Sequence, residues 1–367
     1  TNMTSWPNCV EPGRPCSPSP AEDSALIEAV ARDEGRCIRA CLDQRQRVGV
    51  TMVSTGYRTS AVFFQSENIR CAGTLFRPAD SPQEVPCVVL AHGFSGTMDW
   101  IVPDFARRFA AGGLAALTFD YRYLGASGGL PRQLITTSGQ RVDLRNAVDL
   151  ARRCDGIDGD RIALWGTSLG GSHVLDLASN DGSIAAVVAN VPAIDLIRGM
   201  FGRATRPGLE LTRAELGLAT ARLLGSAALD AVAGALRRPP HYIRVYGMPG
   251  RAIFSDPALA DLFRTLEQQS PTWRNRITPR FLFNMPRYRR GVLERIRAPL
   301  LVTLARDDEI VSSAYTRQKI AEVPHYEIHE YPVSHFEMYH GAVQEQVAAD
   351  HLSFLRRELS LHADDVR

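Results

Sequence analysis

The feature that most constrains the fold of this chain is a repeated alternation of buried-looking apolar runs with amphipathic helical stretches. The apolar runs are continuous rather than alternating, which is typical of strands covered on both faces of a sheet. They occupy residues 86–92, 114–122, 162–168, 184–192, 298–305 and 326–333. Helical periodicity fills most of the gaps between them. The order predicts an α/β fold with a mostly parallel central sheet flanked by helices.

Two regions depart from this alternation. Residues 58–78 contain two short runs rich in β-formers, separated at Glu67-Asn68, and predict an antiparallel pair. Residues 196–290 hold helical pieces and a Pro/Gly/aromatic stretch, and they interrupt the alternation between two strands. We therefore expect a core of residues 58–195 and 291–367 with a helical lid at 196–290. A flexible arm (1–22) and an N-terminal helical extension (23–57) are expected to precede the core.

The length and charge of the chain narrow the class of partner. A chain of 367 residues can form one large domain with an insertion, or two domains. Its net charge of +2 gives no long-range attraction to nucleic acid or to a membrane. No stretch reads as apolar for long enough to span a bilayer, and no signal peptide is visible. We expect a cytoplasmic protein acting on a small molecule, with secretion after processing and a homo-oligomer left open.

Six of the seven cysteines form two groups. Cys87 and Cys154 sit in or beside apolar runs and are predicted to be small core residues. The other notable group lies near the N-terminus and comprises Cys9, Cys16, Cys37 and Cys41. We expect free thiols there, although a disulfide or a metal role stays open.

The segment Gly166-Thr167-Ser168-Leu169-Gly170 joins a predicted buried strand to a predicted helix. The pattern Gly-x-Ser-x-Gly indicates a nucleophile only in that context, because the turn then strains and exposes the serine. The serine stands at the carboxyl end of a parallel strand, where open α/β sheets bind ligands. The N–H groups of the helix's first turn favour negative charge there. We therefore predict that Ser168 is a nucleophile and not merely part of a tight turn.

A nucleophilic serine needs a general base, and the base needs an orienting carboxylate. In the α/β type of serine hydrolase these follow in the order Ser, acid, His, each after a later strand. The loop after residues 326–333 supplies His335, with His340 as the fallback. The loop after residues 298–305 offers Asp307, Asp308 and Glu309, and spacing alone does not choose among them.

The remaining requirement is an oxyanion hole of two backbone N–H groups. Leu169, directly after the serine, would supply one. The loop after residues 86–92 begins His92-Gly93-Phe94, and the N–H of Phe94 would supply the other because Gly93 allows a close approach. We expect His92 to support this loop by hydrogen bonding rather than to transfer protons.

Taken together, these motifs resemble the α/β-hydrolase superfamily from about Arg58 to the C-terminus. The resemblance implies that the acid follows a small-x-x-Asp-x-x-Val pattern, which residues 305–311 match with Asp308 as the acid. Some members place the acid one strand earlier, where this chain has Asp195.

A closer resemblance rests on "FDYRYLGASGGLPRQ", residues 119–133. This segment is similar to dienelactone-hydrolase-like and X-Pro-dipeptidyl-peptidase-like members, and to polyketide-pathway enzymes, some of which transfer acyl chains. Two departures matter: dienelactone hydrolases proper use a cysteine nucleophile, and nothing here is long enough for the extra β domain of X-Pro peptidases. We expect Asp120 and Arg122 to form a buried ion pair or a loop clamp. Turn formation is expected of Gly125, Gly128 and Gly129.

The pattern predicts a serine hydrolase that cleaves a carboxylic ester, lactone or thioester through an acyl-enzyme, without metal or organic cofactor. An acyltransferase that passes the acyl group to an alcohol or amine is the alternative, and an X-Pro-type peptidase is a third. A ligand-binding protein on the same scaffold would not need all three catalytic residues. The expected acyl pocket draws on the lid residues Phe201, Tyr242, Tyr246, Met248 and Phe254.

Overall fold

The computed structural model describes residues 52–54, 56–79, 81, 83–199 and 211–360 of the chain. The described residues belong to one compact unit. The predicted arm (1–22), nearly all of the predicted helical extension (23–57) and the four N-terminal cysteines lie outside them. Phe201 does so too.

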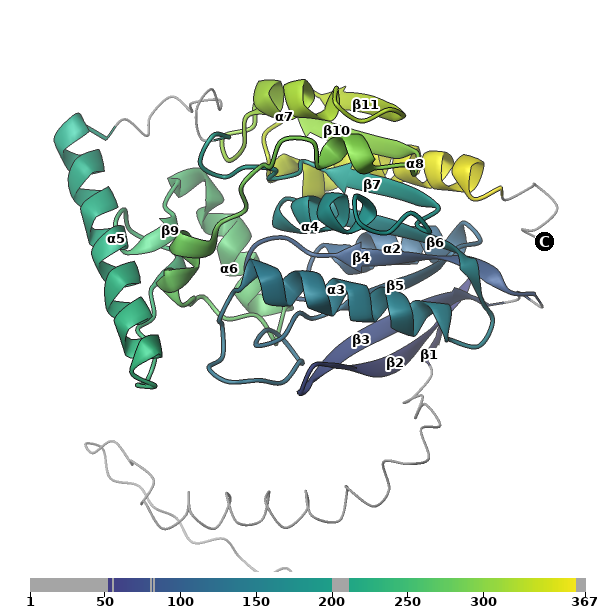
Figure 1. The fold of residues 1–367 in the computed structure, drawn as a ribbon, viewed down its shortest axis with the longest axis horizontal. Coiled ribbons are helices and arrows are strands. Elements are labelled where there is room, and N and C mark those ends of the chain that lie inside the picture. Colours follow the sequence, from purple (N-terminus) through teal and green to yellow (C-terminus); the bar gives the residue numbers. More distant parts are fainter. Residues whose placement is uncertain (1–51, 55, 80, 82, 200–210, 361–367) are drawn as a thin grey trace, which may run out of the picture. The chain divides into compact units, whose positions relative to one another are not determined.

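A nine-stranded sheet forms the centre of the described structure, and its parallel part confirms the predicted α/β architecture (Figure 1). Its spatial order is β1 (Met52–Ser54), β2 (Tyr57–Ser66), β3 (Ile69–Pro78), β5 (Ala115–Phe119), β4 (Val85–Ala91), β6 (Ile157–Thr167), β7 (Ala186–Asn190), β10 (Leu300–Ala305) and β11 (Tyr326–Tyr331). All neighbours from β5 to β11 pair in parallel. The carboxyl ends of these strands therefore meet at one edge of the sheet, where the site is built.

The first strands pair in antiparallel fashion, and the β2–β3 pair among them is the one that the sequence predicts. Glu67 closes the β2–β3 hairpin with a φ of 54°, next to Asn68. The sheet begins at β1, however, which pairs with β2 through Met52↔Thr59. The expected boundary at residue 58 is therefore wrong, because the core already includes Met52.

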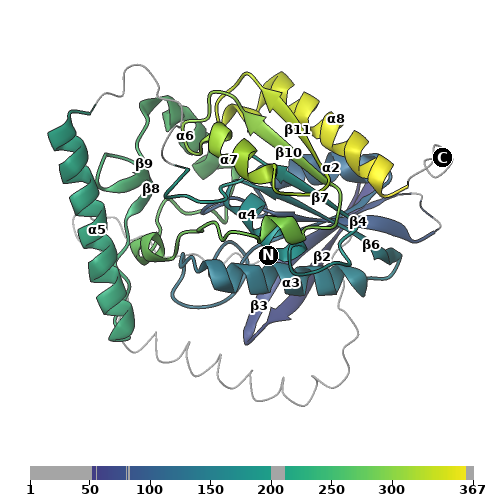
Figure 2. The same cartoon turned by 45° about the horizontal axis from the view of Figure 1, so that its top comes forward.

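Helices cover the sheet on both faces (Figures 1 and 2). One face is covered by α2 (Val102–Ala111) and α8 (Gly341–Glu358), which contact each other, and the other by α3 (Thr137–Arg152) and α4 (Leu169–Ala178). A shorter helix, α7 (Ser313–Ile320), links the last two strands. Every residue of β4 is buried, as expected for a strand between two helical layers.

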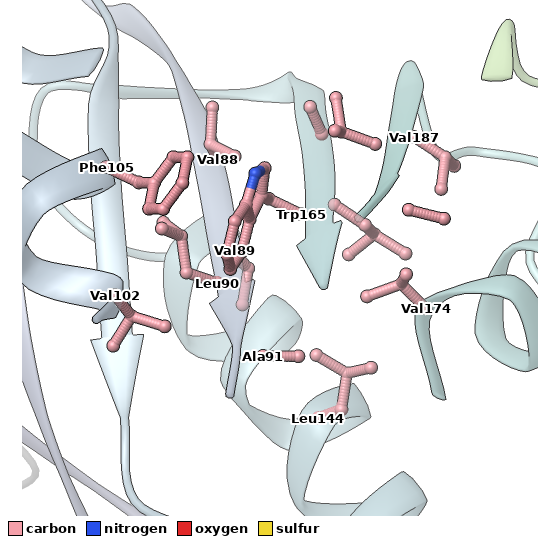
Figure 3. Packing of buried hydrophobic residues seen from close by; sticks show 14 of the residues in the cluster. Val88, Val89, Leu90, Ala91, Val102, Phe105, Leu144, Trp165, Val174 and Val187 are labelled. Atoms are coloured by element: carbon pink, nitrogen blue, oxygen red, sulfur yellow. The ribbon is translucent and has the colours of Figure 1, made fainter. Parts of the chain in front are cut away.

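The core packs around β4 and β6 (Figure 3). Phe105 of α2 lies against Trp165 of β6, with their ring centroids 4.6 Å apart, while Val174 and Leu144 approach from the helices of the opposite face. The Trp165 indole donates to Nδ1 of the buried His351 at 3.0 Å, so its polar atom is satisfied inside the core. Cys87 and Cys154 are buried free thiols, which confirms their predicted core positions.

A segment between β7 and β10 contributes no strand to the nine-stranded sheet. It contains α5 (Arg213–Ala235), β8 (Arg244–Tyr246), β9 (Ala252–Phe254), α6 (Ala260–Gln269) and the short 3-10 helices Pro257–Leu259, Pro279–Asn284 and Leu293–Arg295. The inserted segment, as we call residues 196–290, departs and returns at neighbouring points, because the Leu196 N–H donates to the Pro286 carbonyl. Asp195 fastens both ends: its Oδ1 accepts from the Ile197 and Arg198 N–H groups and its Oδ2 from that of Tyr288.

Helix α5 stands at the outer edge of this segment, farthest from the sheet (Figure 1). Thr212 and Glu215 begin it with a capping box. Among the described helices it is the one that is long and apolar enough to cross a membrane, with a mean hydropathy of 1.3 over an 18-residue window. Our expectation that no stretch is apolar for long enough to span a bilayer is therefore wrong. Arg, Gly and Thr residues interrupt this stretch, so it does not look continuously apolar in the sequence. Only 11% of that window is buried, so α5 is not a core helix.

Candidate active site

Ser168 occupies a strained turn between β6 and α4, with φ 53° and ψ −116°. Such a conformation costs a non-glycine residue about 1–3 kcal/mol and persists only where the surroundings enforce it. Steric crowding excludes any side chain at the two flanking glycines. A Cβ on Gly166 would lie 2.4 Å from the Gly170 carbonyl oxygen, and a Cβ on Gly170 would lie 2.2 Å from the Ala91 carbonyl oxygen. The Ser168 N–H donates to the Asn190 carbonyl of β7 at 2.9 Å, which fixes the turn on the neighbouring strand.

The loops after β10 and β11 bring His335 and Asp308 together. Nδ1 of His335 lies 2.8 Å from Oδ2 of Asp308, and both side chains are almost wholly buried. The other carboxylate oxygen accepts the N–H groups of Ile310 and Val311, each at 2.8 Å. The carboxylate is therefore held in one orientation, with the histidine Nδ1–H as its third donor.

The pKa of His335 reflects this environment. Burial alone would lower the pKa, but the charge and hydrogen bond of Asp308, with a further contribution from Glu309, outweigh it and raise the pKa above its usual value. An imidazole in this position accepts a proton more readily than an ordinary buried histidine.

The competing candidates lie elsewhere. Asp307 is exposed and paired with Arg306. Glu309 accepts the backbone N–H of His335 at 3.2 Å and so supports the histidine's loop. His340 is exposed just before α8. Asp195 is occupied by the backbone N–H groups at the two ends of the inserted segment.

The loop after β4 lies directly against Ser168. A Cβ on Gly93 would lie 3.3 Å from the Ser168 Cβ, so a glycine is what lets the backbone approach this closely. His92 Nδ1 lies 3.0 Å from the Gly93 carbonyl, as expected of a loop support. Burial lowers the pKa of His92 to about 4, so the ring is neutral at pH 7 and Nδ1–H is the donor. Leu169 begins α4, where the first N–H groups have no acceptor within the helix.

Asp120 is the clamp for this loop. Its carboxylate accepts the Met98 N–H from the loop after β4 and the Ala126 N–H from the loop after β5, both at 2.7 Å. Burial raises the pKa of this carboxyl to about 6 despite those bonds. Arg122 does not pair with it but with Asp143, at 2.8 Å, so the predicted Asp120–Arg122 ion pair is wrong and the loop clamp is what the structure contains.

Ser168 and His335 line the same cavity, which is otherwise largely apolar. Its wall is made of His92, Gly93, Phe94, Gly96, Trp100, Ile101, Val102, Thr167, Val245, Phe254, Phe263, Trp273, Phe336 and Tyr339. Val245, Phe254, Phe263 and Trp273 come from the inserted segment, which therefore closes one side of the cavity. No Asp or Glu belongs to the described lining.

Of the expected pocket residues that the structure describes, Phe254 lines this cavity and three others do not. The Tyr242 hydroxyl donates to the Arg132 carbonyl on a different surface. Tyr246 stacks on Phe263, with centroids 4.9 Å apart, but does not itself line the cavity, and Met248 is 72% exposed. The packing within the inserted segment follows no period that the sequence displays, so the sequence does not distinguish Phe254 from the other three residues.

Two polar networks beside the site were not predicted from the sequence. Asp99, in the loop after β4, accepts from the Ser270 hydroxyl and from both the N–H and the hydroxyl of Thr272, so it ties this loop to the inserted segment. The Tyr339 hydroxyl lies 2.7 Å from that of Thr167, the residue before Ser168. Tyr339 stands four residues after His335, and that proximity in the chain is the signal that would have found it.

The described residues contain no group of three side chains suited to hold a metal ion. The site is thus built from a strained serine, a buried His–Asp pair and backbone N–H groups around an apolar cavity. This set can carry out acyl transfer by general-base-assisted attack on a carbonyl carbon.

Comparison with known proteins places this geometry in context. The family model described as serine aminopeptidase, S33, matches residues 82–346. The quorum-quenching protein AidA of Acinetobacter baumannii is 34% identical over 81% of this chain and 94% of its own length. The polyketide transferase ATR5 of Stachybotrys chlorohalonatus is 27% identical over 75% of this chain and 89% of its own. Among solved structures, the α/β hydrolase GrgF of a Penicillium species superposes with a TM-score of 0.66 at 24% identity, covering 83% of this chain and 99% of GrgF.

Proposed function

Because this chain belongs to the serine aminopeptidase S33 family of α/β hydrolases, we propose that it cleaves a carboxylic ester, lactone or thioester through an acyl-enzyme on Ser168. The observation that carries the proposal is that three loops of the sheet converge. They hold Ser168 at φ 53° and a buried His335–Asp308 pair, and Ser168 and His335 line the same cavity.

The chemistry follows from the hydrogen-bond directions. Asp308 accepts Nδ1–H of His335, which leaves Nε2 unprotonated and able to accept a proton. Nε2 takes the Ser168 hydroxyl proton as Oγ attacks the carbonyl carbon, and then gives it to the departing alcohol or thiol. A water molecule, deprotonated by the same nitrogen, hydrolyses the acyl-enzyme and frees Ser168.

The oxyanion hole is assigned to the backbone N–H groups of Phe94 and Leu169. Supporting this assignment are the close approach of Gly93 to Ser168 and the position of Leu169 in the first turn of α4. Donors of this kind are preorganised, and removing one typically costs about 10²–10³-fold in kcat.

The lining of the cavity favours an apolar acyl group as substrate. A peptidase that selects a free N-terminal amine needs an anionic group to receive it, and the described lining offers no carboxylate. Aromatic side chains suit an acyl chain instead. The name of one relative, a polyketide transferase, supports the same class of substrate. We therefore favour an ester or thioester over a peptide.

Acyl transfer to an alcohol or amine is the second candidate, and the contribution of the inserted segment to the cavity favours it. We propose that this segment acts as a lid, since it supplies Val245, Phe254, Phe263 and Trp273 to the wall over Ser168. A lid that excludes water lengthens the life of the acyl-enzyme until another acceptor arrives. The first half-reaction is identical in the two candidates.

Labelling with a fluorophosphonate probe tests the shared step. Wild type and the Ser179→Ala variant, whose altered hydroxyl lies at the far end of α4 bonded to the Asp176 carbonyl, should label equally. Ser168→Ala should not label. Equal labelling of Ser168→Ala, or none in wild type, would refute the acyl-enzyme.

Product analysis then separates the two candidates. An acyl thioester is incubated with the enzyme in the presence and absence of an alcohol acceptor. Free acid alone in both samples supports hydrolysis, whereas an ester of the added alcohol supports transfer.

A further inference from the structure

The outward side of α5 is an apolar surface without a partner among the described residues. Five large apolar side chains on it are between 49% and 62% exposed. They are Leu218, Leu224, Leu229, Val232 and Leu236. A soluble protein seldom exposes so many on one helix, and such a patch usually marks an interaction site.

These side chains share one face of α5. At 100° per residue they span about 140° of the helix circumference, and the residues between them on this face are Ala and Gly. The opposite side is the one that packs on the protein. Its buried residues are Ala219, Ala227 and Asp230, and Asp230 forms an ion pair with Arg280 at 2.8 Å.

Basic side chains border this apolar face. On the helical wheel, Arg213 and Arg222 lie at its two edges, about 90° from its centre. Arg237 and Arg238 follow the end of the helix. They line a groove with Arg132, Arg276 and Arg280 on the inner side of the last turn, where Arg280 lies against Gly234. Glu215 is the one acidic residue exposed on α5, and it is engaged in the capping box with Thr212. An apolar face bordered by guanidinium groups is the pattern of a helix that lies in a bilayer interface.

We propose that this outer face of α5 docks on a lipid bilayer that carries anionic headgroups. The apolar side chains enter the boundary between headgroups and acyl chains, and the bordering arginines contact lipid phosphates. The helix lies along the surface rather than crossing the bilayer, because its inner face is fixed to the protein through Asp230 and Arg280. This proposal replaces our expectation of no membrane partner, and it stands independently of the acyl chemistry.

A second copy of the chain fits the face less well. A helix of 23 residues is about 35 Å long and about 10 Å wide, so pairing through α5 alone would bury roughly 700 Å² in total. A stable interface needs about 1,000 Å² or more. A two-fold axis would also bring Arg213 and Arg222 of two copies close together at the edges of the interface, and like charges would repel.

The test is co-sedimentation of the full-length protein with vesicles. One set contains phosphatidylcholine alone and the other contains 30% phosphatidylglycerol in phosphatidylcholine. We expect binding to the anionic vesicles, weakened at least tenfold between 0.05 and 0.5 M salt because the arginine contribution is screened. The double variant Leu218→Glu/Leu229→Glu should lose at least tenfold in affinity, since it places two charges on the apolar face.

Leu216→Glu is the matched control: Leu216 is also exposed on α5 but lies on the side away from this face, so its variant should bind as wild type does. The midpoint of urea unfolding should be close to that of wild type in all variants, which shows that they fold and keeps this test separate from the proposed function. The proposal is overturned if the wild type binds neither kind of vesicle or if the double variant binds as well as the wild type.

Two other outcomes would assign the face to a different occupant. If the wild type forms a dimer that the double variant does not form, and neither binds vesicles, the face belongs to a second copy of the chain. Increased proteolysis of residues 1–51 in the double variant, without vesicle binding, would assign it to the chain's own N-terminal segment.

Discussion

Replacing Asp308 by asparagine should disable the proposed base by changing the tautomer of His335. The carboxylate accepts three N–H groups: two from the backbone at one oxygen and Nδ1–H of His335 at the other. An asparagine in the same place must turn its carbonyl oxygen toward the two backbone donors. Its NH₂ group then faces Nδ1 and donates to it. Nδ1 must therefore be unprotonated, and the neutral ring carries its proton on Nε2. The nitrogen that should receive the Ser168 proton is then already protonated.

The expected loss in kcat is about 10³ to 10⁴-fold, or roughly 4–5.5 kcal/mol of transition-state stabilisation. KM should change little, because Asp308 does not line the cavity. The pH profile should also move. Wild type needs a neutral His335, whose raised pKa places the acid limb of kcat/KM above that of an ordinary histidine. Without the carboxylate charge, burial dominates and lowers the pKa, so the limb of the variant shifts to lower pH.

The assay is the steady-state hydrolysis of p-nitrophenyl esters from pH 5 to 9, combined with urea unfolding to confirm that the variant is folded. Asp307→Asn is the control, since Asp307 is an exposed neighbour that pairs only with the exposed Arg306 among the described residues. A kcat for Asp308→Asn within tenfold of wild type would refute the assigned role. A large loss in Asp307→Asn alone would move the acid to that residue.

Three further predictions concern the supports of the site. Asp99→Asn should lower the free energy of unfolding by about 1–3 kcal/mol and speed proteolysis of the inserted segment, because it weakens the bonds that hold that segment to the loop after β4; urea titration and timed proteolysis measure this. Gly170→Ala should cost more than about 3 kcal/mol or prevent folding, whereas Gly182→Ala, with open space around it, should not; soluble yield and Tm decide. Tyr339→Phe, which removes the bond to Thr167, should reduce kcat about three- to tenfold with little change in Tm, and a Tm drop without a kcat change would show a purely structural role.

The sequence predicted which loops of the sheet carry the candidate site residues, although it needed the family resemblance to choose Asp308 among three neighbouring carboxylates. Ser168, Asp308 and His335 each follow a predicted strand, and because those strands run parallel their carboxyl ends meet at one edge. The lining of the cavity could not be predicted in the same way. Met248 is apolar but exposed, whereas Trp273, far along the inserted segment, lines the cavity. No period in the sequence reports such long-range packing, so tertiary contacts alone decide which apolar residues line the cavity.

The fastening at Asp195 has a consequence for how such an enzyme diversifies. The Asp195 carboxylate binds the backbone at both ends of the inserted segment, so it holds the two points where this segment leaves and rejoins the core close together. Their spacing does not depend on the length of the segment between them. Loop-closure entropy grows slowly with length, by about 0.6 kcal/mol for each doubling. Evolution, or an engineer, could therefore exchange residues 199–287 for a segment of another length while leaving Ser168 and His335 in place on the sheet. Under the proposed function, substrate range would then be a separable trait, because the inserted segment supplies four residues of the cavity wall and none of Ser168, Asp308 and His335.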